Sequence, residues 1–162
     1  MPKSLNLLAL AGAAALAAGL AIAQEDDDSP EERAHEAREQ HMQLQAFNLG
    51  KIGAMAQGQA DYDAAVAQAA ADNLDQLSAL LISSHDFYWV PGSSSEEVED
   101  SRALPAIWEN MEDFRARETA LQEATTALRS AAGTDLASLQ AALGAVGQAC
   151  GGCHEDYRAQ DD

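Results

Sequence analysis

Cysteine is scarce in this sequence, which has two among 162 residues, Cys150 and Cys153, only three positions apart. Two cysteines so close together cannot cross-link distant parts of a chain. The sequence therefore excludes the disulfide framework that stabilises many small secreted domains. No convincing strand can be recognised, and a chain of this length is expected to form one domain.

Basic residues are also few. Nine Lys and Arg residues stand against 27 Asp and Glu residues, which gives a formal net charge of −18 at pH 7. Such a surface repels nucleic-acid phosphates and anionic lipid headgroups, so we expect neither nucleic acid nor a membrane surface as partner. The charge suits a basic redox protein that is attracted electrostatically. The alternative is that it only keeps a helical surface solvated.

The longest apolar run, from Leu5 to Leu20, follows Lys3 and precedes Ala21-Ile22-Ala23, which has the small–x–small pattern of a signal peptidase site. We predict a cleaved secretory signal over residues 1–23 and an exported, periplasmic domain over residues 24–162. A retained membrane anchor is the alternative. The apolar run is short for a bilayer span, however, and an acidic rather than a basic segment follows it.

Four amphipathic segments predict an all-α fold, an antiparallel four-helix bundle. The first opens at Ser29-Pro30-Glu31-Glu32, which combines a serine cap, a proline and a glutamate. The second begins near Asp61, the third starts around Leu104-Pro105 and stops at Gly133, and Thr134 caps the fourth. The stripes expected to face the core are Met42, Ala46, Leu49, Gly53 and Ala56; Val66, Ala69, Asn73, Leu74, Leu77 and Leu81; and Ile107, Met111, Phe114, Leu121, Thr125, Leu128 and Ala132.

The connection before the third helix, roughly residues 83–103, is long for a helical bundle. It contains an aromatic cluster, His85-Asp86-Phe87-Tyr88-Trp89, and an acidic run from Glu96 to Asp100. We expect the aromatic cluster to plug one end of the bundle. The alternative is that it screens the edge of a bound group from water.

The fourth helix places both cysteines on its buried face, and His154 follows directly, which gives the Cys-x-x-Cys-His spacing of covalent haem attachment. In this interpretation Cys150 and Cys153 bond to the two vinyl groups of one porphyrin and His154 coordinates the iron. An apolar bundle interior excludes water and sets the potential. The stripe of this helix is Leu136, Leu139, Leu143, Val146, Cys150, Cys153 and Tyr157.

Three other interpretations fit the two cysteines less well. A thioredoxin-like dithiol opens a helix after a strand near the start of its domain, whereas only nine residues follow Cys153. A zinc site needs four ligands, and this motif supplies three that lie within about one helical turn. A pair of inert buried thiols leaves the adjacent histidine and the oxidising compartment unexplained.

Several segments resemble the class II c-type cytochromes, the cytochrome c′ family, over essentially the whole mature chain. VGQACGGCHEDYR is similar to the family's terminal signature, RALPAIWENMEDF to its third helix start, and GQADYDAA to its entry into the second helix. The attachment motif alone is shared by all c-type cytochromes, whereas its combination with the other blocks is specific. In the first helix the matching residues are Arg38, Met42, Asn48, Leu49, Gly50 and Ile52.

The resemblance implies a four-helix bundle with one covalently bound haem c. It assigns the thioethers to Cys150 and Cys153 and the proximal axial ligand to His154. Arg158, one turn after that ligand, would approach the proximal imidazole, or would be an ordinary surface arginine. Arg38 would face a haem propionate, and Met42 would point at the other face of the iron.

Met42 decides between two subgroups of the family. In high-spin members the distal side chain covers the iron without binding it, and nitric oxide or carbon monoxide can bind there. In low-spin relatives a methionine ligates the iron, which leaves electron transfer. The other histidines are poor candidates for a sixth ligand: we expect His41 to face solvent, His35 to lie near the haem rim, and His85 to be solvated in the loop.

We therefore interpret the chain as an exported haem protein for one-electron transfer, with gas binding as a second, conditional role. The alternatives are a low-spin electron carrier closed to gases and a periplasmic thiol–disulfide protein. No nucleophile–base constellation suggests an enzyme. The resemblance also implies a possible homodimer through the first two helices, where Gly50, Gly53, Ala54 and Gly58 would allow close approach.

Overall fold

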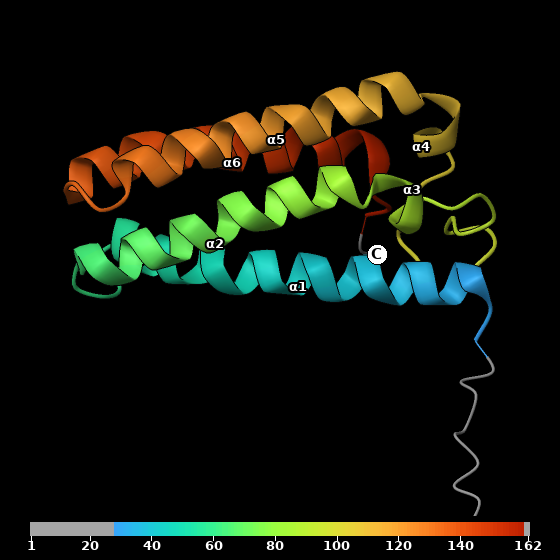
Figure 1. The fold of residues 1–162 in the computed structure, drawn as a ribbon, viewed down its shortest axis with the longest axis horizontal. Coiled ribbons are helices and arrows are strands. Elements are labelled where there is room, and N and C mark those ends of the chain that lie inside the picture. Colours follow the sequence, from blue (N-terminus) through green and yellow to red (C-terminus); the bar gives the residue numbers. More distant parts are fainter. Residues whose placement is uncertain (1–27, 161–162) are drawn as a thin grey trace, which may run out of the picture.

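The computed structural model describes residues 28–160, so the predicted signal segment, residues 1–23, lies outside the described residues. The described residues form a helical bundle with no named strand, and the predicted all-α four-helix architecture is confirmed (Figure 1). None of these helices is both long and apolar enough to cross a bilayer. The long helices are α1 (Pro30–Ala56), α2 (Ala64–Ser83), α5 (Met111–Ala131) and α6 (Leu136–Tyr157), and the one-turn helices α3 (His85–Tyr88) and α4 (Ala106–Glu109) lie between α2 and α5.

The helix ends follow local capping chemistry. The predicted capping box at α1 is present, because Ser29 Oγ accepts from the Glu32 amide (3.1 Å) and Glu32 Oε2 accepts from the Ser29 amide (2.7 Å). Asp63 caps α2, and Asp135 rather than Thr134 caps α6, with its Oδ1 accepting from the amide of Ser138 at 2.8 Å. A carboxylate is a strong cap, which explains the one-residue difference.

The third predicted helix is divided in two. The segment that begins at Pro105 forms only the one-turn α4, and Asn110 leaves helical geometry at φ −129° and ψ 44° before α5 begins. The break lets α5 start in a new direction. It also places Ile107 and Phe114 in one apolar cluster with Tyr157 at the end of α6.

The predicted core stripe of α1 is wrong by one residue. The buried face carries His41, Gln45, Asn48, Ile52 and Met55, each one position before the predicted residue. Polar contacts explain the rotation: Asn73 of α2, for example, donates to Asn48 Oδ1 at 2.9 Å. Of the predicted residues, Leu49 does pack against the central core cluster, and Met42, Ala46 and Leu49 also line a cavity.

The predicted stripe of α2 is correct only in its second half. Leu74 and Leu81 are buried, but Val66 is 46 % exposed, and Ala69 and Asn73 are also exposed. Small residues, Ala67, Ala70 and Ala71, occupy the buried face in the first half. Their size allows close packing of α2 against its neighbours in the central cluster.

The long connection covers one end of the bundle (Figure 1), but only part of the aromatic cluster plugs that end. Trp89 contacts Phe114 edge to face, with ring centroids 4.7 Å apart, whereas Phe87 is 76 % exposed. The residues buried most completely in the connection are serines, Ser93 and Ser94. Buried hydroxyls need hydrogen-bond partners, so polar contacts must hold this segment.

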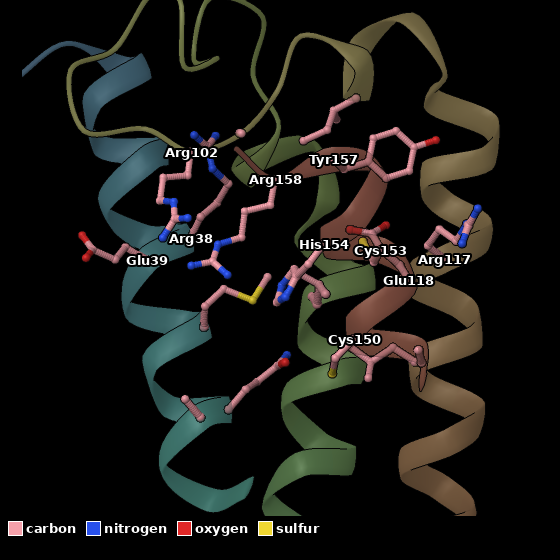
Figure 2. A pocket seen from close by; sticks show the side chains of 18 of the residues that line it. Arg38, Glu39, Arg102, Arg117, Glu118, Cys150, Cys153, His154, Tyr157 and Arg158 are labelled. Atoms are coloured by element: carbon pink, nitrogen blue, oxygen red, sulfur yellow. The ribbon is translucent and has the colours of Figure 1, made fainter. Parts of the chain in front are cut away.

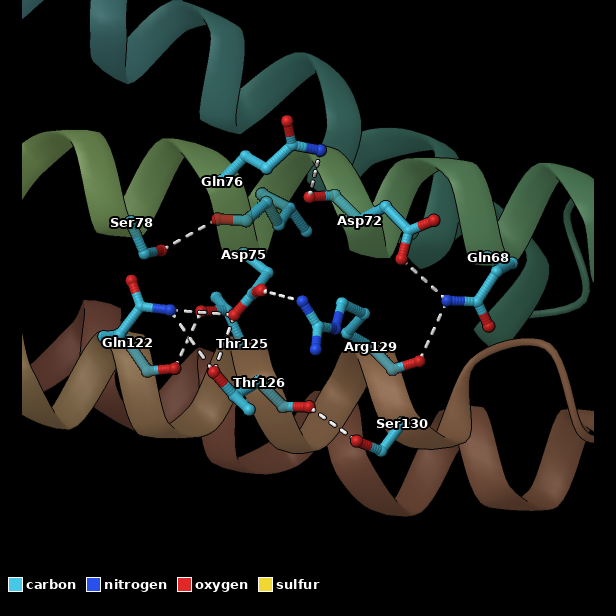
Figure 3. A network of polar contacts seen from close by, with 11 residues as sticks. Gln68, Asp72, Asp75, Gln76, Ser78, Gln122, Thr125, Thr126, Arg129 and Ser130 are labelled. Atoms are coloured by element: carbon cyan, nitrogen blue, oxygen red, sulfur yellow. Dashed lines mark hydrogen bonds and ion pairs between the residues drawn. The ribbon is translucent and has the colours of Figure 1, made fainter.

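A buried carboxylate joins α2 to α5. Asp75 accepts hydrogen bonds from Gln122 Nε2 (2.8 Å), Thr126 Oγ1 (2.6 Å) and Arg129 Nη1 (2.7 Å), as Figure 3 shows. The three donors occupy successive positions along one face of α5. This network therefore fixes the register of the two helices.

We expect Asp75→Ala to lower the free energy of unfolding by about 1–3 kcal/mol, because three donors lose their common acceptor and the half-buried Gln122 amide is poorly placed to recover water. Denaturant unfolding followed by circular dichroism measures the change. Glu123→Ala, at an exposed carboxylate of α5, is the control and should stay within about 0.5 kcal/mol. Equal values for the two variants would contradict the role of the network.

Candidate functional site

A cavity of about 640 Å³ lies inside one end of the bundle, between α1 on one side and α6 on the other (Figure 2). Its volume falls in the range of roughly 300–1,000 Å³ that is typical of cofactor sites. Apolar side chains from α2, α5 and α6, including Leu74, Phe114 and Val146, form its deeper walls. The cavity brings together all six predicted site residues: Arg38, Met42, Cys150, Cys153, His154 and Arg158.

Cys150 and Cys153 lie on the α6 wall as free, half-buried thiols. Cys150 packs against the central core cluster and Cys153 against the aromatic cluster at the end of the bundle. Burial raises the pKa of Cys150, and burial followed by the negative charge of Glu118 raises the pKa of Cys153 to about 11. Reactive dithiols have lowered pKa values, so these thiols are poorly suited to disulfide exchange.

His154 follows Cys153 and also lines the cavity. Desolvation, followed by the positive charges of Arg158 and Arg102, lowers the pKa of His154. The lowered pKa favours the neutral imidazole at neutral pH, and this is the form that ligates a metal ion. Met42 of α1 lines the same cavity.

Arg38 is a buried cation, with only 5 % of its surface exposed. One of its terminal nitrogens, Nη1, donates to the Tyr88 carbonyl and to Ser93 Oγ (2.7 Å), and Nη2 donates to the Ser93 carbonyl (2.8 Å). Its guanidinium also lies over the ring of Trp89, 5.0 Å from the centroid. Arg38 therefore ties the long connection to α1, and its predicted contact with a haem propionate stays a prediction.

Burial lowers the pKa of Arg38 to about 10, so this side chain is still charged at neutral pH. A buried cation that donates to carbonyls supplies the polar contacts that the serine-rich connection needs. Ser101, at the far end of the connection, also lies near the guanidinium, with its Oγ 3.4 Å from Nη2. The Arg38 side chain is thus in contact with both ends of the connection, at Tyr88 and at Ser101.

Arg158 lies beside His154 at the cavity (Figure 2), but it is not on a further turn of α6. The helix ends at Tyr157, and Arg158 has extended geometry, φ −121° and ψ 129°. It forms an antiparallel bridge with Ala103, and the Ala159 amide donates to the Arg102 carbonyl at 2.9 Å. Arg158 is nevertheless the C-cap of α6, and its amide donates to the His154 carbonyl at 3.2 Å, so it lies one turn after His154 as predicted and its charge acts on that imidazole.

Two histidines that we expected in solvent are buried. His41 is packed between Gln45, whose Nε2 is 3.0 Å from His41 Nε2, and the hydroxyl of Tyr88, which is 3.3 Å from His41 Nδ1. Its pKa is lowered, mainly by burial. His41 thus holds α3 against α1 and does not enter the cavity lining.

His85 is buried against Glu118, with 2.7 Å between its Nδ1 and Glu118 Oε2. Glu118 lines the cavity, and sequence reasoning missed it. The signal was available: position 118 lies four residues after Phe114 and seven before Thr125, both in the predicted α5 stripe. A carboxylate in an apolar stripe indicates a buried polar contact.

The residues present fit the predicted haem. A planar, largely apolar macrocycle needs an apolar cavity, two thiols on one wall and a neutral imidazole, and these are all here. Its carboxylate groups need cations, and Arg38, Arg102 and Arg158 lie together at the same end of the cavity (Figure 2). Four of the chain's few basic residues line this cavity, which is unexpected for so acidic a protein unless the ligand carries negative charge.

Comparison with known proteins agrees with this fit. The family model described as Cytochrome C′ matches residues 33–158. The "Cytochrome c-554" of Cereibacter sphaeroides is 46 % identical over 153 residues, which is 94 % of this chain and 97 % of that protein. The family model's match includes the whole cavity lining, from His35 to Arg158.

Solved structures show the same fold. A cytochrome c′ from Rhodobacter sphaeroides superposes with a TM-score of 0.77 and 37 % identity, over 81 % of this chain and 98 % of that one. Another cytochrome c′, described as having a ligand-controlled dimer dissociation, gives a TM-score of 0.72 and 32 % identity, over 82 % and 98 %.

We expect Arg38→Ala to loosen the connection that closes the cavity. The Tyr88 and Ser93 carbonyls lose their donors, which should lower the free energy of unfolding by about 3 kcal/mol. Protease cleavage between residues 89 and 101 should become faster, which peptide mass analysis detects. Arg38→Lys should be cleaved at a rate between those of the parent and Arg38→Ala. A lysine ammonium keeps the positive charge but cannot donate from two terminal nitrogens in one plane, as the guanidinium does.

Arg33→Ala, at an exposed arginine of the same helix, is the control for the loss of one positive charge. It should leave the cleavage rate of the connection unchanged. Equal cleavage of the Arg38→Ala and Arg33→Ala proteins would show that other contacts hold the segment.

Proposed function

Because this chain belongs to the cytochrome c′ family, whose members carry one covalently attached haem c, we propose that it is an exported, periplasmic electron carrier. It is a haem protein of the electron-transfer and gas-binding type, and a classical enzymatic activity is not part of the proposal. The observation that carries it is the cavity with two thiols and a neutral imidazole on one wall.

Each wall has a separate task in this proposal. Cys150 and Cys153 hold the haem through thioethers, and His154 holds the iron from the α6 side. The haem, when bound, supplies the one-electron chemistry. Phe114 and the aliphatic residues around it exclude water, and the arginines at the end of the cavity bind the propionates. The strongly acidic surface favours a basic redox protein as the partner.

Binding of a small gas is the second candidate function. Met42 and His154 line the same cavity from two different helices, α1 and α6, and Met42 would cover the other face of the iron. The relative with ligand-controlled dimer dissociation supports a site that exchanges ligands. The alternative, ligation by Met42, would close that face and leave electron transfer alone.

The first test is the visible spectrum of the reduced protein, made in a host that attaches haem, with and without carbon monoxide. We expect the haem to stay attached to the chain when the protein is denatured, because thioether bonds are covalent. We also expect the native protein to give a broad high-spin spectrum that changes when carbon monoxide is added. Sharp bands indifferent to the gas would instead assign Met42 as a ligand, and Met42→Ala should then restore the response. Folded protein without haem absorption would overturn the proposal and favour the dithiol alternative.

A homodimer through α1 and α2 is part of the same proposal. Phe47 on α1 is 63 % exposed, and it borders a shallow groove with Gly50, Ala54 and Val66. Exposed apolar residues beside small ones suit the close approach of a second copy. The relative described as dissociating under ligand control is itself a dimer.

We expect Phe47→Glu to convert the dimer to a monomer in sedimentation velocity, because it places a charge in the apolar contact of both copies. Phe87→Glu, at an apolar residue that is exposed elsewhere, should leave the dimer unchanged. A dimer that persists in Phe47→Glu, or a monomeric parent protein, would contradict this interface.

A further inference from the structure

Glu118 and His85 form a buried acid–base pair that neither haem attachment nor ligation requires. Their side chains are 4 % and 5 % exposed, and 2.7 Å separates Glu118 Oε2 from His85 Nδ1. Glu118 lines the cavity, and its negative charge reaches Cys153 on α6, where it contributes to the raised pKa of that thiol after burial. A change in the charge of this pair is therefore felt at the haem site.

The outer partners of the pair determine how many protons it holds. The Trp89 indole, which can only donate, donates to Glu118 Oε1 at 3.0 Å. The thioether of Met111, which can only accept, lies 3.1 Å from His85 Nε2, so Nε2 carries a hydrogen. One proton is then left between His85 Nδ1 and Glu118 Oε2. With that proton the pair is neutral overall, and without it the pair carries one negative charge.

We propose that Glu118 and His85 form a proton-binding site coupled to the redox state of the protein. The pair takes up one proton from solvent when a one-electron donor reduces the haem, and it releases that proton when the electron leaves. One electron and one proton enter together, so the net charge of the cavity region stays constant. This inference rests on the proposed haem function.

The sign of the coupling follows from electrostatics in a buried site. An added electron makes the region more negative, which favours the protonated pair, and oxidation favours the deprotonated one. Burial, opposed by the His85 hydrogen bond, raises the pKa of Glu118 above its ordinary value of 4.5. The reduction potential should therefore fall as the pH rises through the range in which the pair loses its proton.

Other charged groups near the pair are already paired with one another. Arg115 of α5 and Asp86 of α3 form an exposed ion pair at 2.8 Å, and Arg117 of α5 is held by Asp113 and by Asp156 of α6. Arg38 of α1 lies over the ring of Trp89. Asp75 of α2, further along α5, is bound by Arg129. Two buried titratable sites without a charged partner of their own are then left among the described groups. One is the Glu118–His85 pair, which reaches the cavity through Glu118, and the other is His41 of α1, which is held by Gln45 and Tyr88 and does not line the cavity.

The test is a redox titration of the haem-bearing protein between pH 5 and 9. For full coupling of one proton to one electron, the potential falls by about 59 mV per pH unit. Glu118→Gln keeps an acceptor for Trp89 and a donor for His85 but cannot release a proton. We expect this variant to lose at least half of the slope. Glu123→Gln, an exposed carboxylate on the same helix, should retain it.

Proton uptake can also be measured directly on the unaltered protein, by reducing it in weakly buffered solution with a pH indicator. Uptake that is present in the parent and absent in Glu118→Gln supports the proposal. If that variant does not fold, His85→Gln should shift the pH range of uptake instead. No uptake in the parent, or equal slopes in the parent and Glu118→Gln, would overturn it.

A protein without haem would show no reduction potential at all, which is failure of the proposed function. A protein with haem and a flat pH profile would contradict the proton coupling alone. The two failures are therefore distinguishable in the same experiment.

Discussion

The buried guanidinium of Arg38 is the contact on which the closed end of the bundle depends. The connection between α2 and α5 is rich in serine and acidic residues, and residues 90–101 bury few apolar side chains apart from Val98. Instead, hydrogen bonds from one side chain of α1 reach Tyr88, Ser93 and Ser101. A planar cation with several fixed donors is suited to this task, whereas a single ammonium is not. This segment supplies Trp89 and residues 100–103 to the cavity lining, so the contacts of Arg38 also hold that wall of the cavity.

Sequence reasoning succeeded where the information is local. The capping box at Ser29 needs only four residues, and the period of α6 placed both cysteines on the wall that they occupy. The spacing of Cys150, Cys153 and His154 then led to the haem and to the family. A cofactor-binding motif is local by nature, because one element carries all of its attachment groups.

It failed where a residue's surroundings come from distant parts of the chain. His85 is buried by Glu118, 33 residues further on, and His41 by Tyr88, 47 residues further on. The α1 stripe failed for another reason. Met42 and Leu49 line a cavity, whereas the buried face one position earlier combines apolar contacts of Ile52 with a polar contact of Asn48 to α2. The period of apolar residues identifies the apolar face of a helix, but it does not tell whether that face contacts another helix or a bound group.

The antiparallel pairing of residues 102–104 with residues 157–159 has a consequence for the order of maturation. The chain is made from its N-terminus, so α1 to α5 exist before α6 can join them. Both attachment cysteines and the segment that pairs with Ala103 lie in this last portion. Placing α6 therefore brings the two attachment cysteines to the cavity and completes the pairing with Ala103 at the same time.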